Sequence, residues 1–201
     1  MNPRIVLVLS LVCVAALAAV LLAASKRGAD EEAPSASRGF AGSPLPRGLR
    51  APDFSLRDEQ GKPLSLRRFR GRPVLVTFLY TTCEDSCPAQ AQTVRGALDE
   101  LGHDLPAVAI AVDPPTDTPR RARAFLAQQR ALGRLRFALG SRDELRPVWR
   151  GFAIRPQSVT EEHQARFTLV DRRGFQRVGF PGERATPELL AHDLRLLERE
   201  R

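Results

Sequence analysis

The sequence predicts a three-layer α/β/α sandwich around a mixed central β-sheet. Segments 74–80 and 107–112 are nearly continuous runs of apolar, strand-forming residues, which is typical of strands that are buried on both faces. Helical segments follow both runs, and an alternating hairpin pattern occurs near each end of the domain. This order of strands and helices favours one sheet that is covered by helices on both sides.

The first part of the domain is expected to contain a hairpin, a buried strand and a helix. Residues 51–56 and 64–66 alternate between apolar and polar side chains, and residues 58–61 between them turn the chain. This pattern indicates a β-hairpin, which precedes the buried strand 74–80. A helical stretch over about residues 86–101 follows that strand.

Two capping signals mark helices in the next part of the domain. Thr118 as N-cap and Pro119 as the first helical residue begin a helix that we expect to run to about Leu132. A capping box formed by Ser141 and Glu144 begins another helix.

The last part of the domain is expected to contain a short strand, a hairpin and a helix. Segment 136–139 is the short strand, and segments 166–170 and 175–180 form the hairpin on either side of a tight turn. Thr186 and Pro187 supply the N-cap and the first residue of the last helix. The apolar face of this helix is expected to contain Leu189, Leu190, Leu194 and Leu197.

The N-terminus contains one candidate membrane span. Residues 5–24 carry no charge, and as a helix they would be about 30 Å long, which matches the apolar core of a bilayer. The run is longer than the apolar core of a signal peptide usually is, so we expect residues 1–24 to remain as an anchor. Cleavage after Ala24 or Ser25 stays open, because small residues end the run. A short basic start before a single early span predicts a bacterial inner-membrane protein whose bulk faces the periplasm.

Residues 25–50 are expected to be a flexible linker. The segment is rich in glycine, proline, serine and arginine, a composition that does not form a core. A tether of this kind would keep the domain, residues 51–201, near the membrane while letting it reach a partner.

The charge of the chain does not point to nucleic acid. The formal net charge is +8, and among the 31 basic residues only Lys26 and Lys62 are lysines. The arginines are scattered, with local groups at 67–72 and 120–123, and no aromatic interleaving, zinc-finger or helix-turn-helix pattern accompanies them. We therefore expect no nucleic-acid partner, while a preference for an acidic protein partner stays open.

The pair Cys83 and Cys87 carries the chemistry, because it follows a buried strand and leads into a helix. A spacing of four places both sulfurs on one side of a first helical turn, where the helix dipole favours thiolates. Open α/β sheets also place their sites at the carboxyl ends of strands. Two convergent thiolates suit dithiol–disulfide redox chemistry or a soft metal ion. A structural disulfide or a pair of inert core thiols is the alternative.

The other sulfur-containing residues, and the spacing of the cysteine pair, limit which kinds of site the chain can form. Cys13 lies inside the apolar run and is expected to be a buried membrane thiol. The only methionine is Met1, which excludes a site of thioether ligands. Three residues separate Cys83 from Cys87, where thioredoxin-type oxidoreductases have two, so the spacing weakens the case for an exchange catalyst without excluding one.

Two motifs and one histidine together resemble those of a known family. Residues 80–88 read YTTCEDSCP, residues 111–119 read AVDPPTDTP, and His163 precedes the strand 167–171. These segments are similar to the CxxxCP signature and the Val-Asp-Pro-x-x-Asp-Thr-Pro stretch of the Sco/SenC proteins. Members of that family are membrane-anchored, thioredoxin-like copper chaperones for cytochrome oxidase assembly. The resemblance covers most of residues 51–200 and implies a thioredoxin-like fold with an N-terminal hairpin.

The resemblance also implies a copper site formed by Cys83, Cys87 and His163. Cu(I) prefers soft thiolates and accepts an imidazole as a third ligand, whereas a structural zinc site normally needs a fourth ligand. The implied bound ion is copper, as Cu(I) or Cu(II). The implied partners are the copper-bearing subunit of a respiratory oxidase, an upstream copper donor and a thiol reductase, with the membrane reached through the N-terminal helix.

Three positions depart from the family pattern. Glu84 stands where proline is common, Ser86 where an apolar residue is common, and Glu162 where aspartate is usual. None of these departures removes a ligand, although a charge at Glu84 would raise the thiol pKa or favour a cationic metal. Asp113 ends the second buried strand and is expected either to lie near the site or to act as a cap.

Three other functions stay open. A thiol–disulfide reductase would need Cys83 and Cys87 but not His163. A peroxiredoxin-like peroxidase would need a peroxidatic cysteine beside an activating arginine. A copper-dependent sensor or antioxidant protein would use the same residues as the chaperone. The remaining histidines, His103 and His192, are expected to be structural or solvated.

Overall fold

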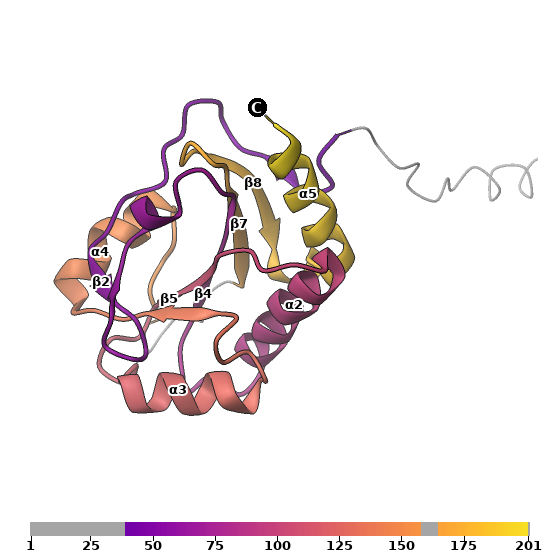
Figure 1. Ribbon diagram of the computed structural model, residues 1–201. Coiled ribbons are helices and arrows are strands. Elements are labelled where there is room, and N and C mark those ends of the chain that lie inside the picture. The colour runs from indigo at the N-terminus through magenta and orange to yellow at the C-terminus, as the bar shows by residue number, and fades with distance from the viewer. Residues whose placement is uncertain (1–38, 158–164, 201) are drawn as a thin grey trace, which may run out of the picture. The chain divides into compact units, whose positions relative to one another are not determined.

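A six-stranded sheet lies at the centre of the computed structural model, which describes residues 39–157 and 165–200 (Figure 1). In chain order the elements are β1 (Ser43–Pro44), β2 (Leu56–Arg57), β3 (Pro63–Leu64), the 3-10 helix η1 (Leu66–Phe69), β4 (Val74–Leu79), α2 (Ser86–Leu101), β5 (Ala107–Ala111), α3 (Pro119–Gln128), β6 (Arg136–Ala138), α4 (Arg142–Gly151), β7 (Arg166–Val170), β8 (Gln176–Pro181), the 3-10 helix η2 (Gly182–Arg184) and α5 (Pro187–Arg199). The strand order in the sheet is β1-β8-β7-β4-β5-β6, and β2 and β3 form a separate hairpin.

The inner strand β4 has neighbours of both directions, which makes the sheet mixed. It pairs in parallel with β5, which in turn pairs in parallel with β6. On its other side β4 pairs antiparallel with β7. All six residues of β4 are buried, as the continuous apolar run predicts. The predicted mixed sheet is therefore confirmed.

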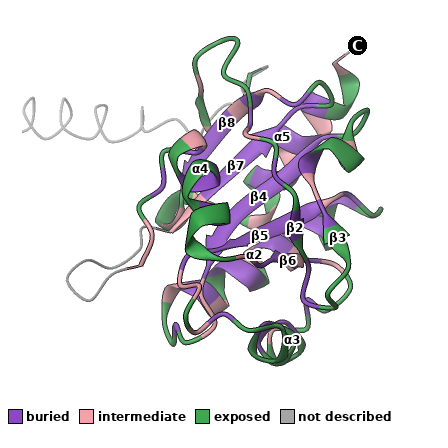
Figure 2. Cartoon of the chain, turned by 90° about the vertical axis from the view of Figure 1, so that its left-hand side faces the viewer, coloured by how far each residue is buried: buried purple, intermediate pink, exposed green. Residues whose placement is uncertain are grey.

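Helices cover both faces of this sheet. Helices α2 and α5 pack side by side on one face, to the right in Figure 1, and α4 lies on the other face (Figures 1 and 2). Figure 2 shows that the strands between these layers are almost entirely buried. The largest fully buried side chains between the layers include Phe78, Phe137, Phe167, Leu98, Leu126, Leu145 and Leu190.

The helix starts that the sequence predicts are all present. The hydroxyl groups of Thr118 and Thr186 each accept the backbone N–H three residues further on. Ser141 and Glu144 form both hydrogen bonds of a capping box at the start of α4. Each of these bonds satisfies an N–H group that has no partner within the first helical turn.

Helix α3 and strand β3 both end earlier in the chain than the sequence predicts. Helix α3 ends at Gln128 rather than near Leu132, and Arg130 then adopts a left-handed conformation with φ of 54° that a helix cannot contain. The second arm of the first hairpin is also shorter than expected. Pairing stops at Leu64, and Leu66–Phe69 form a 3-10 turn instead of further strand.

Three of the four leucines predicted on the apolar face of α5 are buried, and the fourth is not. Leu190, Leu194 and Leu197 are fully buried, whereas Leu189 is exposed. The three buried residues recur at spacings of four and three and so share one helix face. Leu189 lies about 100° around the helix from Leu190, which points its side chain towards solvent.

The sequence places residues 39–50 in the linker, but in the structure they pack against the domain. Strand β1 pairs antiparallel with β8. The buried carboxylate of Asp193 in α5 accepts the backbone N–H groups of Ala41 at 2.7 Å and Gly42 at 2.9 Å. A Cβ at Gly42 would lie 2.5 Å from the side chains of Phe180 and Val178, so this contact requires glycine. The folded unit therefore includes residues that have a linker-like composition.

Within residues 39–157 and 165–200, no helix combines the length and the apolar character that a membrane span requires. The anchor expected at residues 1–24, with Cys13 in it, and the linker up to residue 38 lie outside the described residues.

Phe78, a buried residue of β4, allows a direct test of how the core is packed. Phe78 is fully buried and meets Phe152 of the α4 side edge-on, with ring centroids 5.4 Å apart. Substitution Phe78→Ala should lower the free energy of unfolding by about 3–5 kcal/mol, because it leaves a cavity. Urea denaturation followed by circular dichroism measures this loss. Leu132→Ala, at a side chain that is 49% exposed, should change it by less than about 0.5 kcal/mol, and equal losses in both variants would contradict this packing.

Candidate functional site

The two cysteines lie where β4 ends and α2 begins. Both are free thiols and both are buried, Cys83 with 9% of its surface exposed and Cys87 with none. The backbone N–H of Cys83 donates to the carbonyl of Tyr80 at 3.4 Å, which turns the chain directly after the strand. The expected position at the carboxyl edge of the sheet is confirmed.

The sulfur of Cys83 acts as a cap for α2. Asp85 is the N-cap residue, but its side chain makes no capping hydrogen bond. Instead the Sγ atom of Cys83 accepts the backbone N–H of Cys87 at 3.2 Å, and the hydroxyl of Ser86 lies 3.7 Å from the same sulfur. An N–H group that the first turn leaves free therefore points at a sulfur, an arrangement that stabilises a thiolate.

The two thiols differ in acidity. Burial is the largest influence on Cys83 and raises its pKa, but hydrogen bonds from Cys87, Asp85 and Ser86 outweigh it and bring the pKa below the ordinary value. Burial raises the pKa of Cys87 strongly, and the neighbouring Cys83 raises it further. The pair therefore presents one thiol that ionises more readily than an ordinary cysteine and one that ionises less readily.

A second loop meets the cysteine loop at the same edge of the sheet. It follows β5 and contains Asp113, Thr116 and Asp117. The hydroxyl of Thr116 donates to the half-buried carboxylate of Asp113, so this carboxylate closes a turn within its own loop. The side chain that reaches the cysteine loop is Asp117, whose oxygens accept the N–H groups of Thr81 and Asp113.

Asp117 is the site residue that the sequence analysis missed. Burial is the main influence that raises its pKa to about 6, although the N–H groups of Thr81 and Asp113 oppose the shift. Its hydrogen bond to Thr81, two residues before Cys83, ties it to the cysteine loop, and its negative charge raises the pKa of Cys87. The sequence signal for Asp117 is an acidic residue between a strand end and an N-cap threonine. The sequence analysis instead expected the neighbouring Asp113 to lie near the site or to act as a cap.

A buried amide lies under the cysteine pair. Gln90 follows Cys87 by one helical turn and is 3% exposed. The hydroxyl of Thr77 in β4 lies 3.0 Å from its Oε1 atom and 3.1 Å from the carbonyl of Arg166 in β7. These contacts join α2 to strands β4 and β7. Among the described residues, the Nε2 atom of Gln90 has no hydrogen-bond partner.

His163 and Glu162 lie outside the described residues, but the described residues on both sides of their segment have known positions. The N–H of Gln157 donates to the carbonyl of Val112 at the end of β5, at 3.1 Å. Arg166 begins β7, and its carbonyl lies against Thr77 of β4. Both connections are at the carboxyl edge of β4 and β5, the edge that carries the cysteines.

The described ranges contain no cluster of three or more histidine, cysteine or acidic side chains placed to hold a metal ion. His103 pairs with Glu198 at 2.8 Å, and His192 lies 3.4 Å from the carbonyl of Gly39, so both occupy structural positions as expected. Glu84 is exposed.

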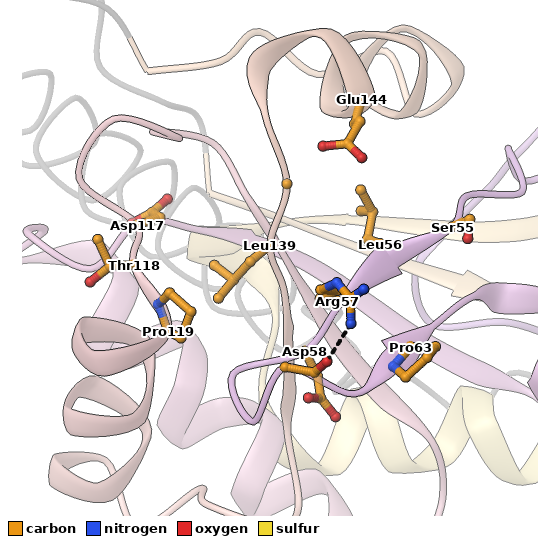
Figure 3. A pocket seen from close by; sticks show the side chains of 12 residues that line it. Ser55, Leu56, Arg57, Asp58, Pro63, Asp117, Thr118, Pro119, Leu139 and Glu144 are labelled. Carbon is orange, nitrogen blue, oxygen red and sulfur yellow. Dashed lines mark hydrogen bonds between the residues drawn. The ribbon is translucent and has the colours of Figure 1, made fainter.

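A cavity of about 560 Å³ has Asp117 in its lining (Figure 3). Asp117 and the start of α3 form one side of it, and residues of the β2–β3 hairpin form the other. Leu139, Gly140 and Glu144 complete the lining. Neither cysteine is among the residues that line this cavity.

Comparison with known proteins finds one family model that covers most of the chain, while the curated relatives also include peroxiredoxins, such as Peroxiredoxin Bcp of Escherichia coli, which is 36% identical over 43% of this chain and 53% of that protein. The SCO1/SenC family model matches residues 44–198. The copper-bound structure of Bradyrhizobium japonicum ScoI is 28% identical, with a TM-score of 0.60, and the alignment covers 74% of this chain and 99% of that one. The chain spans less than half the length of the first curated relatives that it matches, with shares of 45%, 37% and 40%.

Two further structures show the fold. BsSco, described as a member of the Sco family of cytochrome c oxidase assembly proteins with a disulfide switch, is 24% identical with a TM-score of 0.68 over 80% of this chain and 98% of that one. A thioredoxin domain of a thiol-disulfide oxidoreductase from Bacteroides vulgatus is 17% identical with a TM-score of 0.56 over 76% and 99%. The expected thioredoxin-like fold is confirmed.

The difference between the two thiols predicts selective alkylation. In the reduced, metal-free protein, iodoacetamide should modify Cys83 well before Cys87, because Cys83 has the lowered pKa. The rate should rise with pH through a midpoint below that of an ordinary cysteine. Peptide mass spectrometry over a pH series measures both quantities.

The variant Cys87→Ala serves as the control for the cause of this shift. It removes the side-chain donor that hydrogen-bonds to Cys83 but keeps the backbone N–H, so the midpoint of Cys83 should move upwards only in part. Faster modification of Cys87 than of Cys83 in the original protein would contradict the geometry.

Proposed function

Because the chain belongs to the SCO1/SenC family, we propose that it carries copper as its cargo. It binds one copper ion through Cys83, Cys87 and His163 and passes it to the dinuclear copper centre of a respiratory cytochrome oxidase. Two relatives support this proposal. ScoI of Bradyrhizobium japonicum has copper bound in its structure, and BsSco is described as belonging to a family of cytochrome c oxidase assembly proteins.

The observation that carries the proposal is the hydrogen bond from the N–H of Cys87 to the sulfur of Cys83. It holds the two cysteines close together and stabilises one of them as a thiolate before any metal arrives. Cu(I) is a soft ion that prefers thiolate ligands, so a reduced dithiol at the edge of a rigid sheet suits it.

Binding follows from the unequal acidity of the two thiols. Cys83 offers a thiolate for the first contact with the ion, whereas Cys87 must lose its proton when it becomes a ligand. Copper binding therefore releases a proton, and it requires the reduced protein because a disulfide offers no thiolate. A thiol reductase is accordingly one expected partner.

His163 is proposed as the third ligand. The described residues on either side of its segment are fixed at the carboxyl edge of β4 and β5, where the cysteines lie. A neutral imidazole adds to two thiolates without adding charge. A three-ligand site at a sheet edge leaves room for the ligand of a partner, which direct exchange of the ion requires.

The remaining partners and the location belong to the same proposal. The copper-bearing subunit of the oxidase is the acceptor, and an upstream protein donates the ion. Residues 1–24 anchor the chain in the bacterial inner membrane and the domain faces the periplasm. The residues up to 38 keep the domain close to a membrane-bound acceptor, which raises its effective concentration there.

A second candidate function is thiol–disulfide reductase activity. The observation that favours it is the contrast between an acidic, slightly exposed Cys83 and a fully buried Cys87 with a raised pKa. A nucleophilic and a resolving cysteine differ in this way in disulfide exchange.

Loss of each proposed ligand should weaken copper binding. The reduced full-length chain should bind one copper ion, and Cys83→Ser, Cys87→Ser and His163→Ala should each weaken the affinity for Cu(I) at least about tenfold. Competition with a chromophoric Cu(I) chelator measures the affinity. His103→Ala is the matched control and should bind as the original chain does, because His103 pairs with Glu198. Unchanged affinity in His163→Ala would remove this residue from the site.

The same histidine variant separates the two candidate functions. His163→Ala should exchange with a small test disulfide within about twofold of the original rate, because that reaction needs only the two thiols. Stopped-flow measurement of the released thiol gives the rate. An original chain that binds no copper tightly, yet exchanges rapidly, would favour the reductase and contradict the chaperone.

A further inference from the structure

Asp117 is a buried carboxylate beside the dithiol to which the proposed function assigns no role. It is 6% exposed and lies between β5 and α3. Its Oδ1 atom accepts the N–H of Thr81 at 2.7 Å, and its Oδ2 atom accepts the N–H of Asp113 at 3.0 Å. Thr81 follows β4 and Asp113 follows β5, so one side chain joins the ends of two neighbouring parallel strands.

Helix capping does not explain this carboxylate. Thr118 is the N-cap residue of α3, and its own hydroxyl accepts the N–H of Arg121 at 3.3 Å. The side chain of Asp117 instead reaches across the sheet edge to the loop that carries the cysteines. Burying a carboxylate is costly unless its oxygens are hydrogen-bonded, and here both oxygens accept backbone N–H groups.

The contacts of Asp117 lead directly to the cysteines. Thr81 is two residues before Cys83, and the carboxylate is close enough to Cys87 to influence its thiol. The hydroxyl of Thr81 also donates to the carbonyl of Thr116 at 3.5 Å, next to the bond that Asp117 makes. The loop after β4 is thus held at its start by the loop after β5.

We propose that Asp117 is a positioning residue of the copper site. Its carboxylate fixes the start of the cysteine loop against the end of β5, so that Cys83 and Cys87 are already arranged to bind the ion. A preorganised site loses less entropy on binding than a loop that must first be ordered. The negative charge of Asp117 also favours a cation beside Cys87. This inference rests on the proposed function.

The substitution Asp117→Asn tests the inference with little change in size. An amide has one oxygen and one NH2 group, so it can accept one of the two N–H groups and must turn a donor towards the other. The matched control is Asp113→Asn, the same change in the same loop. Within the described part of the chain, the side chain of Asp113 accepts a hydrogen bond only from Thr116, and its backbone N–H stays available to Asp117.

The measurements are the affinity of the reduced full-length chain for Cu(I), by chelator competition, and the hydrogen-exchange rate of the Thr81 amide. Asp117→Asn should bind copper at least about tenfold more weakly, and its Thr81 amide should exchange faster. Asp113→Asn should stay within about twofold in affinity. Added reductant should restore neither the copper affinity nor the slow exchange of the Thr81 amide in Asp117→Asn. Restoration by reductant would assign the effect to oxidation of the cysteines and overturn the positioning role.

Three other results of the copper-affinity measurement would each overturn a part of the account. Equal affinity in Asp117→Asn and the original chain would overturn this inference and leave the proposed function standing. Equal weakening in both variants would assign the effect to the loop in general and overturn the role of Asp117. Absence of copper binding by the original chain would overturn the proposed function and, with it, this inference.

A folding failure of Asp117→Asn leaves a test on the original protein. The Thr81 and Asp113 amides should then exchange as slowly as those of β4, because a buried carboxylate accepts both. Exchange of these amides at the rate of exposed loops would overturn the inference.

Discussion

The position of β4 between a parallel and an antiparallel neighbour is the constraint on which the site depends. All six residues of the strand are buried, and it hydrogen-bonds to β5 on one side and β7 on the other, so its carboxyl end has a fixed place. The chain must turn there to begin α2, and Cys83 lies within that turn. The cysteine loop therefore begins at the end of a buried strand that is paired on both sides.

Three contacts around the end of β4 determine how the two cysteines are placed and how acidic they are. The sulfur of Cys83 takes the N–H of Cys87, Asp117 holds Thr81, and Gln90 joins α2 to the two strands below. The first contact makes one thiol acidic while burial keeps the other protonated. The same arrangement suits a soft metal ion and disulfide exchange, which is why one pair of residues supports both candidate functions.

Much of the fold follows from local sequence signals. The apolar run at 74–80, the threonine–proline starts of α3 and α5 and the capping box at Ser141 each act within a few residues, so the sequence predicts them correctly. The packing of residues 39–50 depends on Asp193, about 150 positions away, and no local pattern reveals it. Asp117 did have a local signal, as an acidic residue before the N-cap Thr118, but its partner Thr81 lies in another loop, so that signal did not reveal the contact with the cysteine loop. The cysteine pair was found because its spacing is itself the signal, whereas the place of His163 stays a prediction.

The most direct test of the central claim is X-ray absorption at the copper edge on the reduced full-length chain loaded with one Cu(I). The account predicts two sulfur scatterers and one nitrogen scatterer, with the nitrogen lost in His163→Ala and one sulfur lost in Cys87→Ser. A first shell of oxygen and nitrogen alone, or a spectrum unchanged by either substitution, would contradict a copper site formed by Cys83, Cys87 and His163.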